Sequence, residues 1–139
     1  MNGYLLDTMV VSDLAKFPID PRLDDWAKST PGEQQFLSVM TLGEMASGIE
    51  DLPDGRRRRD LELWLQRVLA SFESRILSFD QETAMIWGRK HGVLRRKGVN
   101  APAVDLMLAA SALRHGLTVV TRNTRDFARF EVPLLNPWR

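Results

Sequence analysis

The residues Tyr4-Leu5-Leu6-Asp7-Thr8 set the architecture expected for the rest of the chain, because three apolar or aromatic residues lead directly into an aspartate. A short apolar run of this kind is typical of a strand buried on both faces, as in the centre of a parallel sheet. The polar residues Thr8, Ser12 and Asp13 then predict an immediate helix. Asp7 is therefore expected at the carboxyl end of a central strand, where open α/β sheets bind ligands. Its carboxylate is a candidate ligand for a hard cation, and the alternative is a simple helix cap.

The alternation of short apolar strands and amphipathic helices continues outward from this stretch. Proline, glycine and capping residues separate the segments. Further strands are expected at residues 36–40, 76–79 and 117–120, with a short edge strand at 132–135, and helices are expected at 10–16, from 21, from 41, from 56, at 80–97 and at 102–115. This pattern predicts one doubly wound α/β domain spanning residues 1–139, a Rossmann-like parallel sheet of four to five strands with helices on both faces.

Composition limits the chemistry that the chain supports. The 139 residues suffice for one sizeable core, and 19 Lys and Arg against 18 Asp and Glu leave a formal charge of +1. This balance excludes a polybasic coat, although local basic patches remain compatible with it. The absence of cysteine excludes thiolate metal sites, and two histidines exclude a histidine-rich one.

Hydropathy places the protein away from membranes. No apolar run approaches the roughly 20 residues that span a bilayer, and the start lacks a charged region followed by a signal-like apolar core. We therefore expect no membrane partner and a cytoplasmic location.

Glu44 follows the second predicted strand and has two interpretations. Thr41-Leu42-Gly43-Glu44 fits the capping box, in which the threonine and glutamate side chains each bind a backbone amide at a helix start. The same placement puts Glu44 in the first helical turn after a parallel strand, on the sheet edge expected for Asp7. The two interpretations are compatible.

Acidic residues also occur at the next two helix starts. Asp105 is the only acid in a helix that is apolar nearly all round, and the small residues Ala109 and Ala112 leave room on its face. After the fourth predicted strand, Asn123 is a candidate cap for a short helix with Asp126 in its first turn.

These acids share one sheet edge in a parallel fold, and their placement indicates a metal site. Several carboxyl groups repel one another unless they are protonated or neutralised. A site with only oxygen ligands favours Mg²⁺ or Mn²⁺ over zinc. Because such sites act with substrate phosphates, the predicted reaction is hydrolysis of a phosphodiester by a metal-activated water.

Four segments also resemble the motifs of PIN domains. They are Leu-Leu-Asp-Thr near the start, Ser-Val-Met-Thr-Leu-Gly-Glu, Val-Asp-Leu-Met-Leu-Ala-Ala-Ser-Ala, and Val-Val-Thr-Arg-Asn-Thr-Arg-Asp-Phe. Their order and spacing look like the VapC/FitB branch of toxin–antitoxin ribonucleases, and the resemblance covers essentially the whole chain. It implies a PIN fold and a metal-dependent endoribonuclease. It also implies a small DNA-binding antitoxin as partner and a homodimer within a larger complex.

The resemblance also implies roles for individual residues. Asp7, Glu44 and Asp105 match the acidic, metal-binding and catalytic positions, and Thr8 and Thr121 match hydroxyl positions beside the site. Many relatives carry aspartate where this chain has Asn123. Either Asp126 substitutes as a ligand, or the site works with three acids, and the number of metal ions stays open. The RNA target and the RNA-binding residues are not readable from the motifs.

Other interpretations were weighed against this one. A response-regulator receiver domain is also α/β with clustered acids, but Asp7-Thr8 lacks its paired acids and Thr121-Arg122 lacks its lysine. A catalytically weak binding module that acts through its antitoxin stays open, although the three core acids argue against it. The run from Arg56 to Arg59 is interpreted as solvated surface, with an RNA-backbone patch as the alternative. His91 is interpreted as a core or interface residue.

Overall fold

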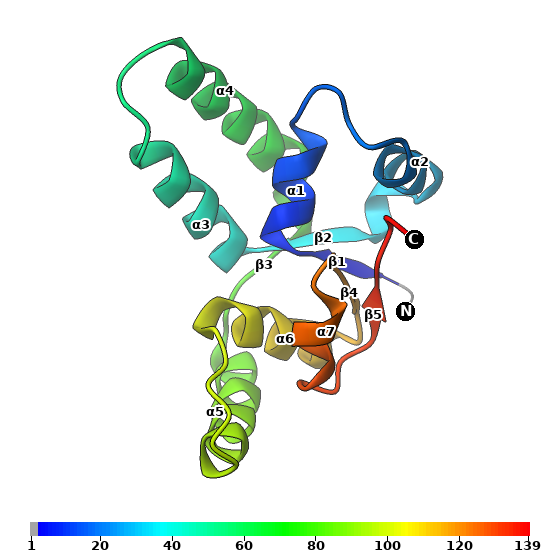
Figure 1. The fold of residues 1–139 in the computed structure, drawn as a ribbon, viewed down its shortest axis with the longest axis vertical. Coiled ribbons are helices and arrows are strands. Elements are labelled where there is room, and N and C mark those ends of the chain that lie inside the picture. The colour runs from blue at the N-terminus through cyan, green and yellow to red at the C-terminus, as the bar shows by residue number, and fades with distance from the viewer. Residues whose placement is uncertain (1–2) are drawn as a thin grey trace.

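A computed structural model describes residues 3–139, in which five short strands alternate with helices (Figure 1). The strands are β1 (Tyr4–Leu6), β2 (Gln35–Ser38), β3 (Ile76–Leu77), β4 (Thr118–Val120) and β5 (Leu134–Leu135). The helices are α1 (Thr8–Leu14), α2 (Pro21–Ser29), α3 (Val39–Glu50), α4 (Arg56–Ser71), α5 (Gln81–Arg96), α6 (Ala103–His115) and α7 (Thr124–Ala128). Single 3₁₀ turns at Gly32–Gln34 and Glu73–Arg75 precede β2 and β3.

All five strands are parallel and lie in the order β3-β2-β1-β4-β5. β1 is central, as its apolar sequence predicts, and β5 is the predicted edge strand. Figure 1 shows the sheet nearly edge-on, with α1 to α4 on one side and α5 to α7 on the other. The α/β parallel sheet with helices on both faces is confirmed.

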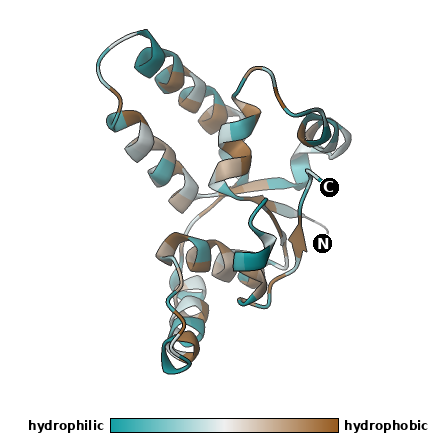
Figure 2. Ribbon diagram, in the orientation of Figure 1, coloured by the Kyte–Doolittle hydropathy of each residue, from teal (hydrophilic) through white to brown (hydrophobic). Residues whose placement is uncertain are grey.

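The core consists of two apolar clusters, one on each face of the sheet. Successive side chains of a strand point to opposite faces, so Leu5 joins the cluster under α5 to α7 and Leu6 joins the cluster under α1 to α4. Val119 and Val120 divide in the same way. Figure 2 shows the strands coloured as hydrophobic and the outer ends of α4 and α5 as largely hydrophilic.

The connection order creates a crevice at the carboxyl ends of β1 and β4. From β1 the chain proceeds to β2 and β3, then crosses back to β4 on the other side of β1. A reversal of this kind separates the helices that follow the two neighbouring strands, and α/β sheets bind ligands there. Asp7 directly follows β1, and Thr121 directly follows β4.

The predicted capping box at Thr41 and Glu44 is wrong. The helix begins earlier, at Val39, and its cap is Ser38, whose hydroxyl accepts a hydrogen bond from the Met40 amide at 3.0 Å. Ser38 is both the last residue of β2 and a helix cap, so the strand ends two residues before the predicted limit. Thr41 therefore lies inside the first turn, and Glu44 lies one turn further along α3.

Other predicted boundaries shift by one or a few residues. α1 begins at Thr8, two residues before the prediction, because the polypeptide turns into the helix directly after Asp7. β3 and β5 keep two residues each, and Pro102, expected near the first position of its helix, is the residue directly before α6. Asp80 caps α5 through the Thr83 amide as predicted. None of the helices between residues 3 and 139 combines the length and apolar character of a bilayer-spanning segment.

Candidate active site

Asp7 is held rigidly at the crevice between β1 and β4. Its backbone amide donates to the Val120 carbonyl at 3.0 Å, which continues the pairing of the two strands. Its side chain is only 6% exposed, and Oδ2 accepts a 2.8 Å hydrogen bond from the buried hydroxyl of Thr121. Asp7 occupies the cap position of α1, and its side chain makes no capping hydrogen bond of good geometry. The backbone amides of Thr8 and Met9 nevertheless lower its pKa, so the carboxylate lies close to the start of the helix as well as to Thr121.

Thr121 is the residue that orients this carboxylate. Its Oγ1 accepts a hydrogen bond from the Asn123 amide at 3.0 Å, so its single hydroxyl hydrogen is directed to Asp7. Burial raises the pKa of Asp7, the hydrogen bond from Thr121 lowers it, and the negative charge of Glu44 raises it again. The net pKa is above the ordinary aspartate value, with burial as the largest cause.

Glu44 reaches the same crevice from α3. Its Oε1 accepts a 2.6 Å hydrogen bond from the hydroxyl of Thr8, the first residue of α1. Thr8 Oγ1 also lies 3.2 Å from the hydroxyl of the buried Thr41. The chain of hydroxyl groups joins the start of α1 to α3 and positions the exposed carboxylate of Glu44 near Asp7.

Asp105 lies in the first turn of α6, on the other side of the crevice. Burial raises its pKa to about 6, and the negative charges of Asp7, Glu44 and Asp126 contribute to the rise, while Arg129 lowers it. Three acids that are up to 98 residues distant in sequence therefore act on one carboxyl group. The structure brings together the four acids that the sequence analysis singled out.

The position after β4 differs from its predicted role. Asn123 precedes α7, but its side chain makes no capping hydrogen bond. Its backbone amide donates to Thr121, and its carbonyl accepts from the Asp126 and Phe127 amides. Asp126 is exposed in the first turn of α7, and its charge reaches Asp105. Of the two candidates for a fourth ligand, Asp126 is the one whose charge raises the pKa of Asp105.

The donor set fits a hard divalent cation. Within residues 3–139, no three Asp, Glu or His side chains lie close enough to form a ready-made multidentate cage. Mg²⁺ usually keeps several waters and binds through only one or two carboxylates, so it does not require such a cage. Burial raises the pKa of Asp105 most, and the negative charges of Asp7, Glu44 and Asp126 raise it further. A cation bound between these acids would offset their mutual repulsion.

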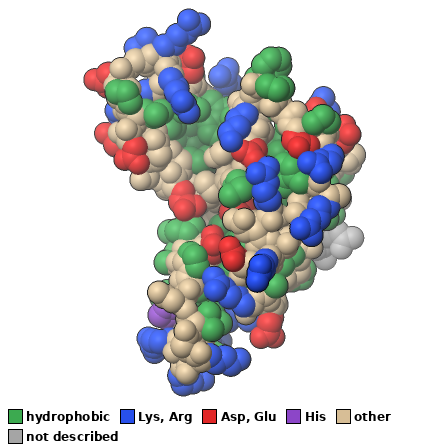
Figure 3. Space-filling model, in the orientation of Figure 1, with side chains coloured by type: hydrophobic (Ala, Val, Ile, Leu, Met, Phe, Trp, Pro, Cys, Tyr) green, Lys and Arg blue, Asp and Glu red, His purple; other side chains and the backbone are tan. Residues whose placement is uncertain are grey.

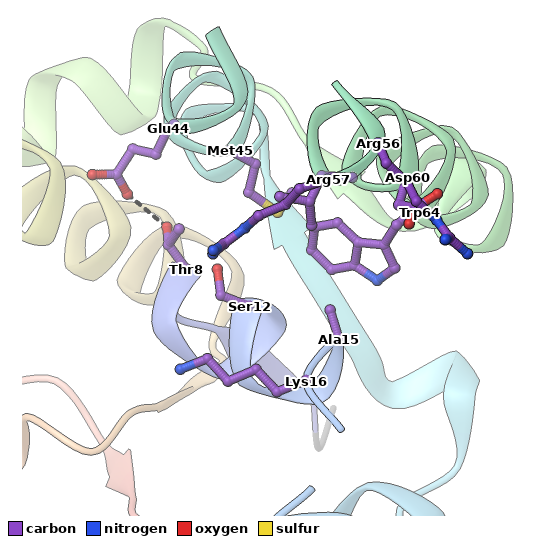
Figure 4. A pocket seen from close by; sticks show the side chains of 12 residues that line it. Thr8, Ser12, Ala15, Lys16, Glu44, Met45, Arg56, Arg57, Asp60 and Trp64 are labelled. Atoms are coloured by element: carbon purple, nitrogen blue, oxygen red, sulfur yellow. Dashed lines mark hydrogen bonds between the residues drawn. The ribbon is translucent and has the colours of Figure 1, made fainter. Parts of the chain in front are cut away.

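A groove of about 720 Å³ opens beside Glu44 and Thr8, between α1, α3 and α4. Ala15, Met45, Leu61 and Trp64 supply apolar walls, and Arg56, Arg57 and Lys16 supply charge. Figure 4 shows Trp64 on the α4 wall and the Arg57 side chain extending across the groove toward Ser12. A partner lying in this groove would reach the acidic crevice.

Two residues near the site carry contacts that the sequence analysis did not single out. Arg122 bonds Asp13 of α1 at 3.3 Å, and its guanidinium stacks 4.2 Å from the ring of Trp138. Arg129 ends α7 and acts on the charge of Asp105. In the sequence, only its position three residues after Asp126 indicates that Arg129 lies near the acids.

Comparison with known proteins identifies the family. The model of the PIN domain matches residues 4–133, nearly the whole chain. The chain belongs to the PIN domain family. This agrees with the four motifs, the parallel sheet and the acids at the crevice.

Individual PIN-domain proteins resemble the chain along its length. Toxin FitB of Neisseria gonorrhoeae is 35% identical over 135 residues, which cover 96% of this chain and 97% of the toxin. VapC ribonuclease Y4jK of Sinorhizobium fredii is 30% identical, with 96% of each chain covered. In the solved structure of FitAB bound to the IR36 DNA fragment, a chain 33% identical superposes with a TM-score of 0.90, covering 98% of this chain and 96% of that one.

Proposed function

We propose that this PIN domain is a metal-dependent endoribonuclease and the toxin of a VapC/FitB-type toxin–antitoxin pair. The observation that carries the proposal is the convergence of Asp7, Glu44, Asp105 and Asp126 at the β1–β4 crevice, expressed in the raised pKa of Asp105. The ribonuclease name of the Sinorhizobium fredii relative supports RNA as the substrate. The toxin name of the Neisseria gonorrhoeae relative supports the biological role.

In this mechanism Asp7, Glu44 and Asp105 would hold Mg²⁺ or Mn²⁺. When bound, the ion would supply Lewis-acid polarisation of the scissile phosphate and a lowered pKa for the attacking water. The chain contributes fixed geometry: Thr121 orients Asp7, and Thr8 orients Glu44. Asp126 is proposed as an outer member of the site. Because the hydroxyl groups fix both carboxylates before substrate binds, little reorganisation is needed during the reaction.

The proposed partner is a small DNA-binding antitoxin that occupies the groove beside Glu44. The solved FitAB assembly on DNA supports a partner of this kind for FitB-like chains. The groove offers apolar walls on three helices and opens at the acids, so an amphipathic segment lying there would block access of RNA. We propose that the toxin forms a homodimer within that larger assembly.

The alternative function is a catalytically weak binding module that acts mainly through its antitoxin. A binding module would use the same groove to bind its antitoxin, but it would not require carboxylates that are held in fixed orientations. The hydrogen bonds Thr121–Asp7 and Thr8–Glu44 are what favour the enzyme.

The test is cleavage of total RNA by the purified, antitoxin-free protein with Mg²⁺, with Mn²⁺ and with EDTA. We expect cleavage only with a metal ion, and loss of most of it in Glu44→Gln. The amide oxygen of glutamine still accepts the hydrogen bond from Thr8, so the stability should change by no more than about 1 kcal/mol. Glu33→Gln is the matched control, because Glu33 is exposed and precedes β2 at the opposite edge of the sheet.

Cleavage that persists in EDTA would contradict the metal requirement. A folded Glu44→Gln protein that cleaves RNA at the rate of the wild type would remove Glu44 from the site. Absence of cleavage with every metal ion and every class of RNA would favour the binding module.

A further inference from the structure

The C-terminal half of α5 carries a dense group of cations. Arg89, Lys90, Arg95, Arg96 and Lys97 occur within nine residues. In the described part of the chain none of them forms an ion pair, whereas Arg58 of α4 pairs with three acids. Arg125 and Arg129 of the α7 segment also lack an acidic partner among residues 3–139. These seven residues are called the basic surface below.

Four members of the basic surface surround a hollow. It has a volume of about 190 Å³ and lies between α5 and the end of α7. Its lining consists of Arg89, Lys90, Lys97, Arg129, Val93, Leu94, Phe130 and Glu131. The guanidinium of Arg129 lies 5.3 Å from the centre of the Phe130 ring. Four cationic side chains thus line this hollow together with three apolar residues, and Glu131 is the only acid among its lining residues.

The basic surface adjoins the acidic site. Asp126 of α7 lies between two members of this surface in the sequence: Arg125 directly precedes it, and Arg129 follows it by three residues, about one helical turn. Arg129 is also the cation that lowers the pKa of Asp105. In Figure 3, acidic side chains lie near the middle of the face, basic ones lie beside them, and more basic ones cover the lower end, which α5 forms.

Helix stability explains only part of this charge. Arg95 and Arg96 lie in the last turn of α5, where cations interact favourably with the helix dipole. Arg89 and Lys90 lie about two turns from the helix end, and Arg129 belongs to another segment. Their mutual repulsion costs free energy, which a bound polyanion would offset.

We propose that the basic surface binds the sugar–phosphate backbone of the RNA strand next to the bond that is cleaved. The inference rests on the proposed ribonuclease function and adds the path of the substrate. From the crevice the strand passes over α7 at Arg129 and continues along the C-terminal half of α5. The contacts are to phosphates, so this surface positions RNA without reading its sequence.

The same observations argue against the run from Arg56 to Arg59 as the backbone site. Arg58 is committed to Glu50, Asp54 and Glu62. Arg56 and Arg57 are exposed and line the groove that the proposed antitoxin occupies. The alternative interpretation of that run as an RNA patch is therefore not favoured.

The test measures binding of a fluorescent single-stranded RNA in EDTA over a series of KCl concentrations. The triple variant Arg89→Gln, Lys97→Gln, Arg129→Gln removes three charges from the basic surface. The control triple variant Arg59→Gln, Arg67→Gln, Arg139→Gln removes three exposed charges, none of them in an ion pair within residues 3–139, from other surfaces. A DNA duplex of the same length serves as the second probe, and cleavage with Mg²⁺ is measured in parallel.

Each phosphate contact to a single strand contributes about 0.7 to the slope of log affinity against log salt, so the first variant should lose about 2 units of slope. Its affinity for RNA at 0.1 M KCl should fall at least tenfold, and that of the control should stay within twofold. Equal slopes in the two triple variants would overturn the inference, and so would a much larger loss of affinity for the DNA duplex than for RNA, which would assign the surface to DNA. If the wild type binds RNA through this surface but cleaves none, the nuclease function fails and the binding surface stands. If the wild type cleaves RNA but the triple variant keeps the salt slope of the wild type, the nuclease function stands and the proposed binding surface fails.

Discussion

Asp105 carries the largest electrostatic perturbation in the candidate site. An aspartate in the first turn of an isolated helix would be stabilised in its charged form by the helix dipole. Here burial and three neighbouring acids act in the opposite direction and raise its pKa to about 6. Burial is the largest cause of this rise, and the charges of the three neighbouring acids add to it. The shift is measurable without any substrate.

Asp105→Asn should stabilise the metal-free protein at neutral pH. Because the folded-state pKa is above the unfolded value near 3.8, the folded state holds the proton more tightly. The free energy of unfolding should then fall as pH rises from about 4 to 6 and level off above. The full shift corresponds to at most about 3 kcal/mol, and screening at this half-buried group reduces it to roughly 1–2 kcal/mol.

The measurement is urea unfolding in EDTA between pH 4 and pH 7.5. Asp105→Asn should equal the wild type near pH 4 and exceed it above pH 6. The control Asp25→Asn, at an exposed position of α2, should follow the wild type throughout. A variant that is less stable than the wild type at pH 7 would show that Asp105 serves only its helix.

At the scale of elements, the start of α3 shows what local sequence does not determine. Apolar runs predict the strands, and caps such as Asp80 predict helix starts, because both depend on neighbouring residues. Ser38 is 1% exposed, as expected for a residue of a buried strand. Its hydroxyl also accepts a hydrogen bond from the Met40 amide and so caps α3. The segment from Thr41 to Glu44 has a capping-box pattern that the earlier cap at Ser38 makes redundant.

The side-chain contacts within the site also cannot be predicted from neighbouring residues in the sequence. Thr8 and Glu44 are 36 residues apart, and Thr121 and Asp7 are 114 residues apart. The identity of the acids is predictable because each follows a parallel strand or starts a helix at one edge. Which hydroxyl bonds which carboxylate depends on side-chain packing, and the place of Arg129 depends on how α7 lies against α6.

Ser38→Ala and Ser38→Gly separate a cap from a strand residue. At a helix cap, alanine costs about 1 kcal/mol and glycine only a few tenths. In a strand interior, glycine costs roughly 0.5–1 kcal/mol more than alanine. We expect the alanine variant to be the less stable of the two in chemical denaturation.

Ser47→Ala is the control for this comparison, because Ser47 is exposed in the middle of α3 and alanine favours helices there. It should be neutral or slightly stabilising. If the glycine variant is less stable than the alanine variant, Ser38 contributes to stability as a strand residue of β2 and not as a helix cap.

At the scale of the molecule, the site joins the two layers of the fold. Asp7 and Glu44 come from the side of α1 to α4, and Asp105 and Asp126 come from the side of α5 to α7. The sheet between the layers places them at one crevice, and residues of β1 and β4 contribute to both apolar clusters. A cation bound there contacts both layers and should therefore raise the stability of the whole domain.

Mn²⁺ at about 100 times its dissociation constant should stabilise the native protein by about 2.7 kcal/mol, since binding to the folded state alone shifts the unfolding equilibrium. For a domain of this size the melting temperature should rise by roughly 5–10 °C. Asp7→Asn should abolish the rise, because Asp7 is buried at the centre of the crevice. Asp126→Asn should show the same rise only at several-fold more Mn²⁺, because Asp126 is exposed and contributes long-range charge. Thermal melts over a Mn²⁺ series at pH 7.5 measure both quantities. An undiminished rise in Asp7→Asn would place the cation elsewhere, and complete loss in Asp126→Asn would make Asp126 a direct ligand equal to Asp7.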